Sequence, residues 1–387
     1  MSVIKDEKSG KWYVHGYVII GDKKRWYKKR GFQKKSNALD YERKCRQELL
    51  EEKYSTSEIF FKDLVSEFLK GSKGNIKEST IEKYKSSLNK WNEYIGEYKL
   101  CNIDQELLQD VIDKFDNKYS KKYVSGLYYA LSSCFEFAIT KKHLKHNPIR
   151  NAKQSKRIDE KKKEMLFWEP EEFNIFISSV NDLMYRTFFM ILFFMGVRKG
   201  EALALQWKDI DFEFNTININ KTTSPKDRNK KIPYTTPKTK NSYRTITMPQ
   251  ILVKQLKLYN AECRNYYGYS KDSFVFGLDK PLATETIRRH YNYFFKKANH
   301  ELKLSCEKNY QEYEPLKKIR IHDFRHSHAS YLINNMIAGF TDYDIAKRLG
   351  DTVTTLHDTY AHWFKRKDEN IINFMNMDFA QNKTAFN

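Results

Sequence analysis

Residues 195–210 read MGVRKGEALALQWKDI, and this stretch decides how the C-terminal half of the chain folds. An apolar helix is expected to end at Gly196, Arg198 follows in the turn, and an amphipathic helix begins directly afterwards. Such a junction fixes a guanidinium on rigid elements, as a phosphate clamp requires. Glu201, three residues further on, can hold a neighbouring side chain in place. The alternative is an ordinary surface ion pair between Arg198 and Glu201, which is worth little.

Three further segments of the same half carry polar groups suited to breaking and rejoining a phosphodiester. They are PKT at residues 237–239, HDFRH at 322–326 and TYAH at 359–362. A second arginine, Arg325, can clamp a phosphate bidentately together with Arg198. Lys238 and His322 can move protons, and the hydroxyl of Tyr360 can attack phosphorus. Each fragment alone occurs by chance in many chains, so only the full set is informative.

In this order, the four segments resemble the catalytic signature of the tyrosine recombinases, the family of phage and transposon integrases. The resemblance covers residues 165–365. It implies that Arg198 and Arg325, together with His322, stabilise the charge on the non-bridging oxygens of a scissile phosphate. The two arginines and the histidine are therefore expected to lie close together in the fold.

The resemblance also implies that Tyr360 is the nucleophile and that Lys238 is the general acid that protonates the leaving 5′-oxygen. Lys240 lies two residues further on and competes for the same role. Because the energy of the broken bond is kept in a protein–DNA ester, neither a cofactor nor a metal is implied. Two extra histidines, His326 and His328, invite a metal site, but they lack a carboxylate partner at a recognisable spacing.

One position departs from the family pattern. After Leu349-Gly350 the family usually has His or Trp, and this chain has Asp351. A carboxylate repels a phosphate and donates no hydrogen bond unless it is protonated. Either Asp351 faces away from the site, or another group such as His357 substitutes for the missing donor.

Composition points to a polyanionic partner. The chain has 387 residues, and 70 Lys and Arg against 49 Asp and Glu leave a net charge of +21. Nucleic acid is the usual partner for such an excess, although a membrane surface or a ribosomal environment would give a similar balance. The five cysteines are widely spaced, as reduced thiols in a cytosol would be. No secretory signal is visible, and the apolar run at 187–197 is too short to span a bilayer. A cytoplasmic, nucleoid-associated bacterial protein without a membrane segment is expected.

Residues 1–56 are predicted to form an arm-type DNA-binding domain, a small three-stranded sheet with one helix. Strands are expected at 12–19 and 25–32, and a helix from 36 to about 52. Alternation predicts a basic ridge on one face and ring packing on the other, and such a ribbon can enter a major groove. The alternative is a solvated edge sheet. The basic residues are Lys23, Lys24, Arg25, Lys28, Lys29, Arg30, Lys34 and Lys35.

The rest of the sequence is expected to form two further domains and the linker between them. Residues 57–150 fit a four-helix core-site DNA-binding bundle, 151–164 an exposed basic linker, and 165–387 a catalytic domain with a C-terminal tail. Strands at 212–220 and 243–248 interrupt a mainly helical pattern. The fold class is therefore multidomain α+β, with a mixed, mainly α-helical catalytic domain of the tyrosine recombinase type.

The implied function is a site-specific DNA recombinase that integrates or excises a phage or mobile element through a 3′-phosphotyrosyl intermediate. Double-stranded DNA with core and arm sites, a homotetramer on DNA, an excisionase and a host DNA-bending protein are the implied partners. Two alternatives stay open. A type IB topoisomerase uses the same chemistry to relax supercoils, and a DNA-binding protein with a decayed site would account for Asp351.

Overall fold

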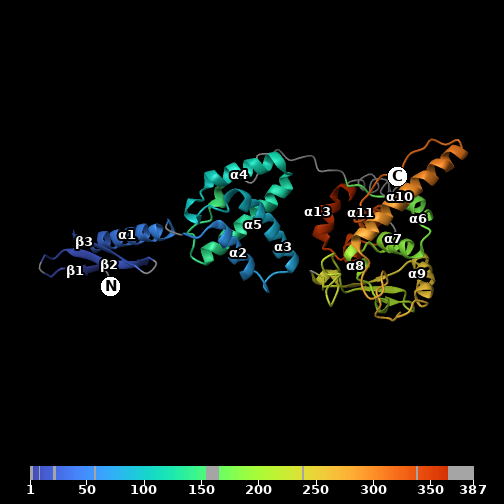
Figure 1. The fold of residues 1–387 in the computed structure, drawn as a ribbon, viewed down its shortest axis with the longest axis horizontal. Helices are drawn as coiled ribbons and strands as arrows, with labels where there is room; N and C mark the ends of the chain where they lie inside the picture. Colours follow the sequence, from blue (N-terminus) through green and yellow to red (C-terminus); the bar gives the residue numbers. More distant parts are fainter. Residues whose placement is uncertain are drawn as a thin grey trace, which may run out of the picture. The chain divides into compact units, whose positions relative to one another are not determined.

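The computed structural model describes residues 3–7, 9–20, 23–55, 58–153, 165–237, 239–336 and 339–364. The chain divides into two compact units, Met1–Lys162 and Lys163–Asn387 (Figure 1). Lys238, the linker beyond residue 153 and the tail beyond residue 364 lie outside the described residues. None of the helices in the described ranges is long and apolar enough to cross a membrane.

The first unit begins with an antiparallel sheet of order β1-β2-β3, formed by Val3–Lys5, Trp12–Ile20 and Lys23–Phe32. Helix α1 (Lys35–Ser55) packs on one face and encloses Val14 and Tyr27. Gly16 pairs with Tyr27 across the sheet, and a Cβ at Gly16 would lie 2.5 Å from the tyrosine hydroxyl oxygen. The predicted small sheet with one helix is therefore confirmed.

The open face of this sheet differs from the prediction, because rings and cations share it. Tyr17 pairs with Trp26 across β2 and β3, and the two ring centroids are 4.8 Å apart. Trp26 is 58% exposed. Since side chains alternate along a strand, Lys24 and Lys28 project on the same face as Trp26. The other two rings, Tyr27 and Phe32, pack towards α1. The predicted separation of a basic face from a face of packed rings is therefore wrong. Helix α1 covers the sheet face that carries Tyr27 and leaves the face that carries Trp26 exposed.

The second part of this unit is a bundle of four helices, α2 (Phe61–Gly71), α3 (Glu78–Ile95), α4 (Gln105–Lys118) and α5 (Lys121–Thr140). Asp104 and Ser120 cap α4 and α5 with their side-chain oxygens. The core is aromatic and aliphatic, and the indole nitrogen of the buried Trp91 donates to the carbonyl of Leu127 at 3.0 Å. The short helices η1 (Leu100–Asn102) and η2 (Pro148–Asn151) connect and close the bundle. The four predicted helices are present.

The second unit is mainly helical around a small sheet. Its elements are α6 (Pro170–Ser178), α7 (Leu183–Met195), α8 (Lys199–Leu203), η3 (Trp207–Asp209), β4 (Ile210–Asp211), β5 (Thr216–Ile219), η4 (Lys240–Ser242), β6 (Arg244–Thr247), α9 (Gln250–Cys263), α10 (Thr284–Lys308), α11 (Asp323–Asn334), α12 (Asp342–Leu349) and α13 (Val353–Phe364). The antiparallel order is β4-β5-β6. The predicted strand at 212–220 is too long, because Asp211 accepts backbone hydrogen bonds from Glu213 and Phe214 and so closes a turn before β5.

Helix α11 organises the second unit. It is buried along most of its length and lies against α7, α12 and α13. Trp168, just before α6, ties the start of the unit to α11, because its backbone N–H donates to Ser327 Oγ at 2.9 Å. Its indole ring packs against the ring of Phe324. This packing gives the residues at the start of α11 fixed positions.

Candidate active site

The junction between α7 and α8 fixes Arg198. Helix α7 ends at Gly196, whose φ of +61° lies in the left-handed region, and a Cβ there would clash with the His328 ring. Arg198 is the N-cap of α8, and its backbone N–H donates to Glu201 Oε2 at 3.0 Å. The predicted sequence of helix, glycine, arginine and helix is confirmed as local structure.

Glu201 lies in the interior and is not part of a surface ion pair. Its side chain is 3% exposed and accepts from Arg198 Nη1 at 3.0 Å and from Arg244 Nη2 at 2.9 Å. Burial works to raise the pKa of Glu201, but the two guanidinium groups, Arg244 above all, outweigh it and lower this pKa. Burial likewise works against the charged form of Arg198, yet Glu201 and Asp351 together raise its pKa. Both groups are therefore held ionised.

Arg325 lies deeper than Arg198. Its side chain is 4% exposed, and its Nη1 donates to the backbone carbonyls of Gly196 and Leu349, each at 2.7 Å. Burial is the main cause that lowers the pKa of Arg325, and the carboxylate of Asp351 opposes it. Two segments far apart in the sequence thus bring their arginines together, as predicted.

Asp351 lies between these arginines. One carboxylate oxygen accepts from Arg198 Nη2 at 2.5 Å, and the other accepts from Arg325 Nη2. The alternative in which Asp351 faces away from the site is therefore wrong. His357 instead contacts Asp342, with Nε2 and Oδ2 2.8 Å apart, so the structure gives no support to its substituting for the missing donor. Asp351 follows directly on Gly350, which ends α12 with a left-handed φ of +71°.

Tyr360 on α13 is buried at 2% exposure, and its hydroxyl lies 2.8 Å from Nδ1 of His326. Burial raises the pKa of Tyr360 to about 12, although the charge of Arg325 works in the other direction. Burial, aided by His322, lowers the pKa of His326 to about 4, so the imidazole is neutral near pH 7. A neutral imidazole has one nitrogen free to accept a proton. Sequence reasoning considered His326 only as a metal ligand and missed this contact.

His322 is the N-cap of α11, and its ring meets the ring of His326 edge-on with centroids 5.3 Å apart. Part of the side chain is exposed to solvent. Loss of hydration next to neighbouring residues, followed by the charge of Arg325, nevertheless lowers the pKa of His322. Arg198 contributes in the same direction, so the imidazole lies within electrostatic reach of both arginines. The structure therefore brings four of the five predicted catalytic residues into one region.

The fifth, Lys238, lies outside the described residues, and so does the side chain of its competitor Lys240. The connection between β5 and β6 is held in place where it leaves β5. The ammonium of the buried Lys221 lies 2.6 Å from Asp209 Oδ2 and makes a cation–π contact with the ring of Tyr234. Beyond Lys238, Thr239 and Ser242 share a hydroxyl hydrogen bond of 2.9 Å.

Two further arginines support the site and were missed from the sequence. Arg244 on β6 is buried, holds Glu201 and donates through Nε to the carbonyl of Arg348 at 2.8 Å. A pattern could have revealed it, because Arg244 shares the inward face of β6 with the buried Ile246. An arginine at such a position requires a buried acid.

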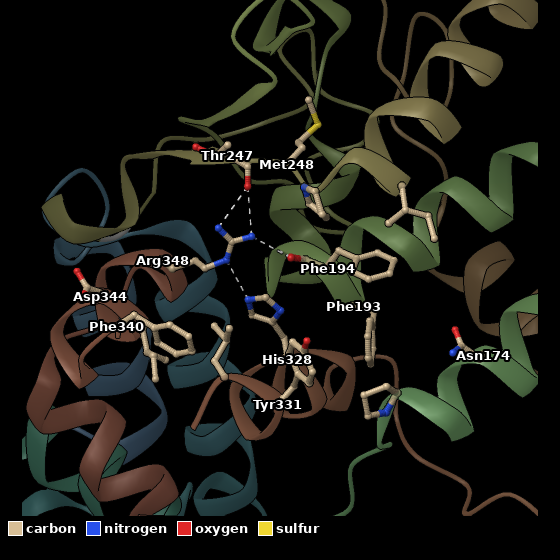
Figure 2. A pocket seen from close by; sticks show the side chains of 15 residues that line it. Asn174, Phe193, Phe194, Thr247, Met248, His328, Tyr331, Phe340, Asp344 and Arg348 are labelled. Atoms are coloured by element: carbon tan, nitrogen blue, oxygen red, sulfur yellow. Dashed lines mark hydrogen bonds between the residues drawn. The ribbon is translucent and has the colours of Figure 1, made fainter. Parts of the chain in front are cut away.

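Arg348 on α12 contacts α11 through His328. Figure 2 shows its guanidinium between the carbonyls of Thr247 and Phe194 and the ring of His328, which accepts from Nε at 3.1 Å. Burial, with the charge of Arg348, lowers the pKa of His328 to about 3. Arg348 also borders a cavity of about 810 Å³ whose lining includes Phe340. His328 is therefore a packing residue, hydrogen-bonded to Arg348.

The predicted DNA-binding residues of the first unit lie on or beside β3. Seven of their side chains are exposed, and that of Lys23 lies outside the described residues. Several cations lie over rings, with Lys24 Nζ 4.8 Å from the centroid of Tyr17 and the guanidinium of Arg30 5.7 Å from that of Tyr13. This surface presents positive charge and aromatic area together.

Comparisons with known proteins agree with this geometry. Residues 156–366 match the phage integrase family, and residues 60–115 match the N-terminal SAM-like domain of phage integrases. The ICEBs1 integrase of Bacillus subtilis is 33% identical over 87% of this chain and 88% of its own length. A XerC-like tyrosine recombinase of Caldanaerobacter subterraneus is 23% identical over 78% of each chain.

Solved structures share the fold. The Tn1549 transposon integrase in complex with a circular intermediate DNA is 20% identical with a TM-score of 0.64, covering 81% of this chain and 99% of its own. A lambda integrase tetramer bound to a Holliday junction is 13% identical with a TM-score of 0.56, covering 92% and 91%. The chain belongs to the phage integrase family and is a tyrosine-type site-specific DNA recombinase. Neither the topoisomerase nor the decayed-site alternative is favoured.

Proposed function

We propose that Tyr360 attacks the scissile phosphate of a DNA strand in line. The Oη–P bond forms and the bond from phosphorus to the 5′-oxygen breaks, which leaves a 3′-phosphotyrosyl link and a free 5′-hydroxyl. The 5′-hydroxyl of another strand then reverses the step. Because one phosphoester replaces another, the exchange needs no external source of energy.

The arginines supply the electrostatic part of this reaction. Arg198 and Arg325 contact the two non-bridging oxygens, where charge develops in the transition state, and His322 adds a third donor. Glu201 and Arg244 keep Arg198 in position without touching the substrate. Lys238 is proposed to protonate the leaving oxygen, a role that the anchored base of its segment supports.

His326 is proposed to receive the phenol proton. Its Nδ1 lies 2.8 Å from the hydroxyl, within the reach required of a general base. Since burial raises the pKa of Tyr360 to about 12, the ring needs such an acceptor to act as a nucleophile near neutral pH.

The relatives support a proposal for the biological setting. Integrases of mobile elements suggest that this protein integrates and excises such an element, acting on nucleoid DNA in a bacterial cytoplasm. The lambda tetramer on a Holliday junction supports a homotetramer on core-site DNA. The bundle at 57–150 is proposed to bind core sites and the sheet at 1–56 arm sites. An excisionase and a host DNA-bending protein would set direction and bring the sites together.

The convergence of Arg198, Arg325, His322 and Tyr360 from separate segments carries this proposal. It is tested with a nicked duplex selected by the full chain from a random library. The wild-type protein should form a denaturant-resistant adduct on DNA 3′ ends, and Tyr360→Phe should bind the same duplex without forming one. An adduct formed equally by Tyr360→Phe would remove Tyr360 from its role.

A further inference from the structure

Asp351 has a contact that the proposed chemistry leaves unused. We propose that this carboxylate fills the phosphate position, the space between the Nη2 atoms of Arg198 and Arg325, and is displaced when a scissile phosphate arrives. Asp351 is then a positioning residue that keeps the two guanidinium groups ready to bind DNA. The inference rests on the proposed function, since that function identifies the anion that takes the place of Asp351.

The geometry of the contact is that of a bound oxyanion. Each carboxylate oxygen accepts from a different guanidinium, as two non-bridging oxygens of a phosphodiester would. A carboxylate that neutralises a single arginine frequently binds it with both oxygens. The bridging arrangement holds the two Nη2 atoms on either side of one small anion.

Each of the two arginines also makes hydrogen bonds that lie outside the phosphate position. Arg325 Nη1 donates to the carbonyls of Gly196 and Leu349, and Arg198 Nη1 donates to Glu201. Neither set of contacts involves the phosphate position. The carboxylate of Asp351 can therefore leave while both guanidinium groups stay in place.

A second feature offers space for the displaced carboxylate. Asp351 borders a cavity of about 680 Å³, and Lys347 and Thr352 line the same cavity. Rotation of the Asp351 side chain towards this cavity exchanges two guanidinium partners for an ammonium, a hydroxyl and solvent. The carboxylate is 14% exposed in its present position, so this route is already partly open.

The charge balance favours this order of events. Arg198, Arg325 and Arg244 carry three positive charges, and Glu201 and Asp351 carry two negative ones. With Asp351 in place the cluster keeps one net positive charge, and burying this charge costs less in a protein without DNA than burying a larger one. With Asp351 withdrawn, the cluster offers one more unit of positive charge to a transition state that gains negative charge.

The test measures binding of inorganic phosphate to the full-length chain by calorimetry and thermal shift. Asp351→Asn keeps the shape but removes the competing charge and replaces one acceptor oxygen with an amide donor. If Asp351 occupies the phosphate position most of the time, phosphate should bind Asp351→Asn at least about tenfold more tightly than wild type. Asp358→Asn is the matched control, because it removes the same charge from an exposed position on α13 and should leave phosphate affinity unchanged.

Formation of the covalent complex separates this inference from the proposed function. Equal phosphate affinity in folded wild type and Asp351→Asn would overturn the inference, whereas a wild-type adduct would still support the recombinase. Tighter phosphate binding by Asp351→Asn, without any wild-type adduct, would support the inference and contradict the proposed recombinase chemistry. If Asp351→Asn does not fold, Asp351→Ser provides the same comparison. Slower cleavage by Asp351→Asn at unchanged phosphate affinity would likewise refute the role of Asp351 as a displaced anion.

Discussion

The sheet of the first unit and the active site of the second unit both gather positive charge, but they hold it in opposite ways. On the sheet, Lys24 and Arg30 lie over exposed rings in contact with solvent. In the site, Arg325 is 4% exposed and its partners are carbonyls and a carboxylate. Exposed cations can position a DNA backbone, whereas buried and paired arginines can stabilise charge that develops during a reaction. The number of basic residues therefore says less about function than their burial.

Removing Arg325 should have the largest effect on both stability and chemistry. Arg325→Ala leaves Asp351 and two backbone carbonyls without their buried donor, so we expect a loss of about 3–5 kcal/mol in unfolding free energy. Adduct formation should be lost as well. Denaturant unfolding of the second unit and single-turnover cleavage measure the two effects separately.

Arg198→Ala is the matched comparison within the site. Because Arg198 is 38% exposed, its loss should destabilise the fold less than that of Arg325. Cleavage should still slow by about 10²–10³-fold, as when one oxyanion donor is deleted. Equal losses of stability in the two variants would contradict the difference in burial.

Replacing His326 should slow cleavage and alter the pH dependence of stability. Loss of a general base typically costs about 10²-fold or more, so His326→Ala should form the adduct at roughly one hundredth of the wild-type rate. Recovery of the full rate in His326→Ala would exclude a role in proton transfer.

The pH dependence has a definite sign. His326 is neutral in the fold, with its pKa lowered to about 4, so the unfolded chain binds more protons below the unfolded pKa of about 6.5. Stability should therefore fall as the pH decreases from about 6.5 to 4, by roughly 3 kcal/mol from this residue. Urea midpoints of wild type and His326→Gln across this range test the expectation, because the variant should lose less stability.

Exposed cations of the sheet should give the smallest effect on stability. Lys28→Ala should change the unfolding free energy by less than about 0.5 kcal/mol. It should weaken arm-site DNA binding and lower the slope of log affinity against log salt by about one. Lys44→Ala, an exposed position on α1, is the control that should change that slope less if the open sheet face contacts DNA.

Local patterns predicted the parts of the site that local sequence controls. The apolar run, Gly196 and Arg198 indicated a helix, a left-handed end and a restarted helix, and all three are present. The four helices of the bundle were predicted for the same reason, since apolar spacing reports the buried face.

Contacts between distant segments could not be predicted in the same way. The orientation of Asp351 depends on Gly350 and on arginines 153 and 26 residues away. Arg244 depends on Glu201, which lies 43 residues earlier. The His326–Tyr360 contact spans 34 residues between two helices. These pairings follow from tertiary packing, and the sequence gives only the residue types that make them plausible.

The identity of the attacking residue tests the central claim most directly. The adduct trapped on a nicked duplex is digested with nuclease and trypsin, and the nucleotide-modified peptide is located by mass spectrometry. Residues 349–365 form one tryptic peptide, in which Tyr360 is the sole tyrosine. The account predicts that this peptide carries the nucleotide. Modification of a peptide bearing any of the other tyrosines, with 349–365 unmodified, would contradict it.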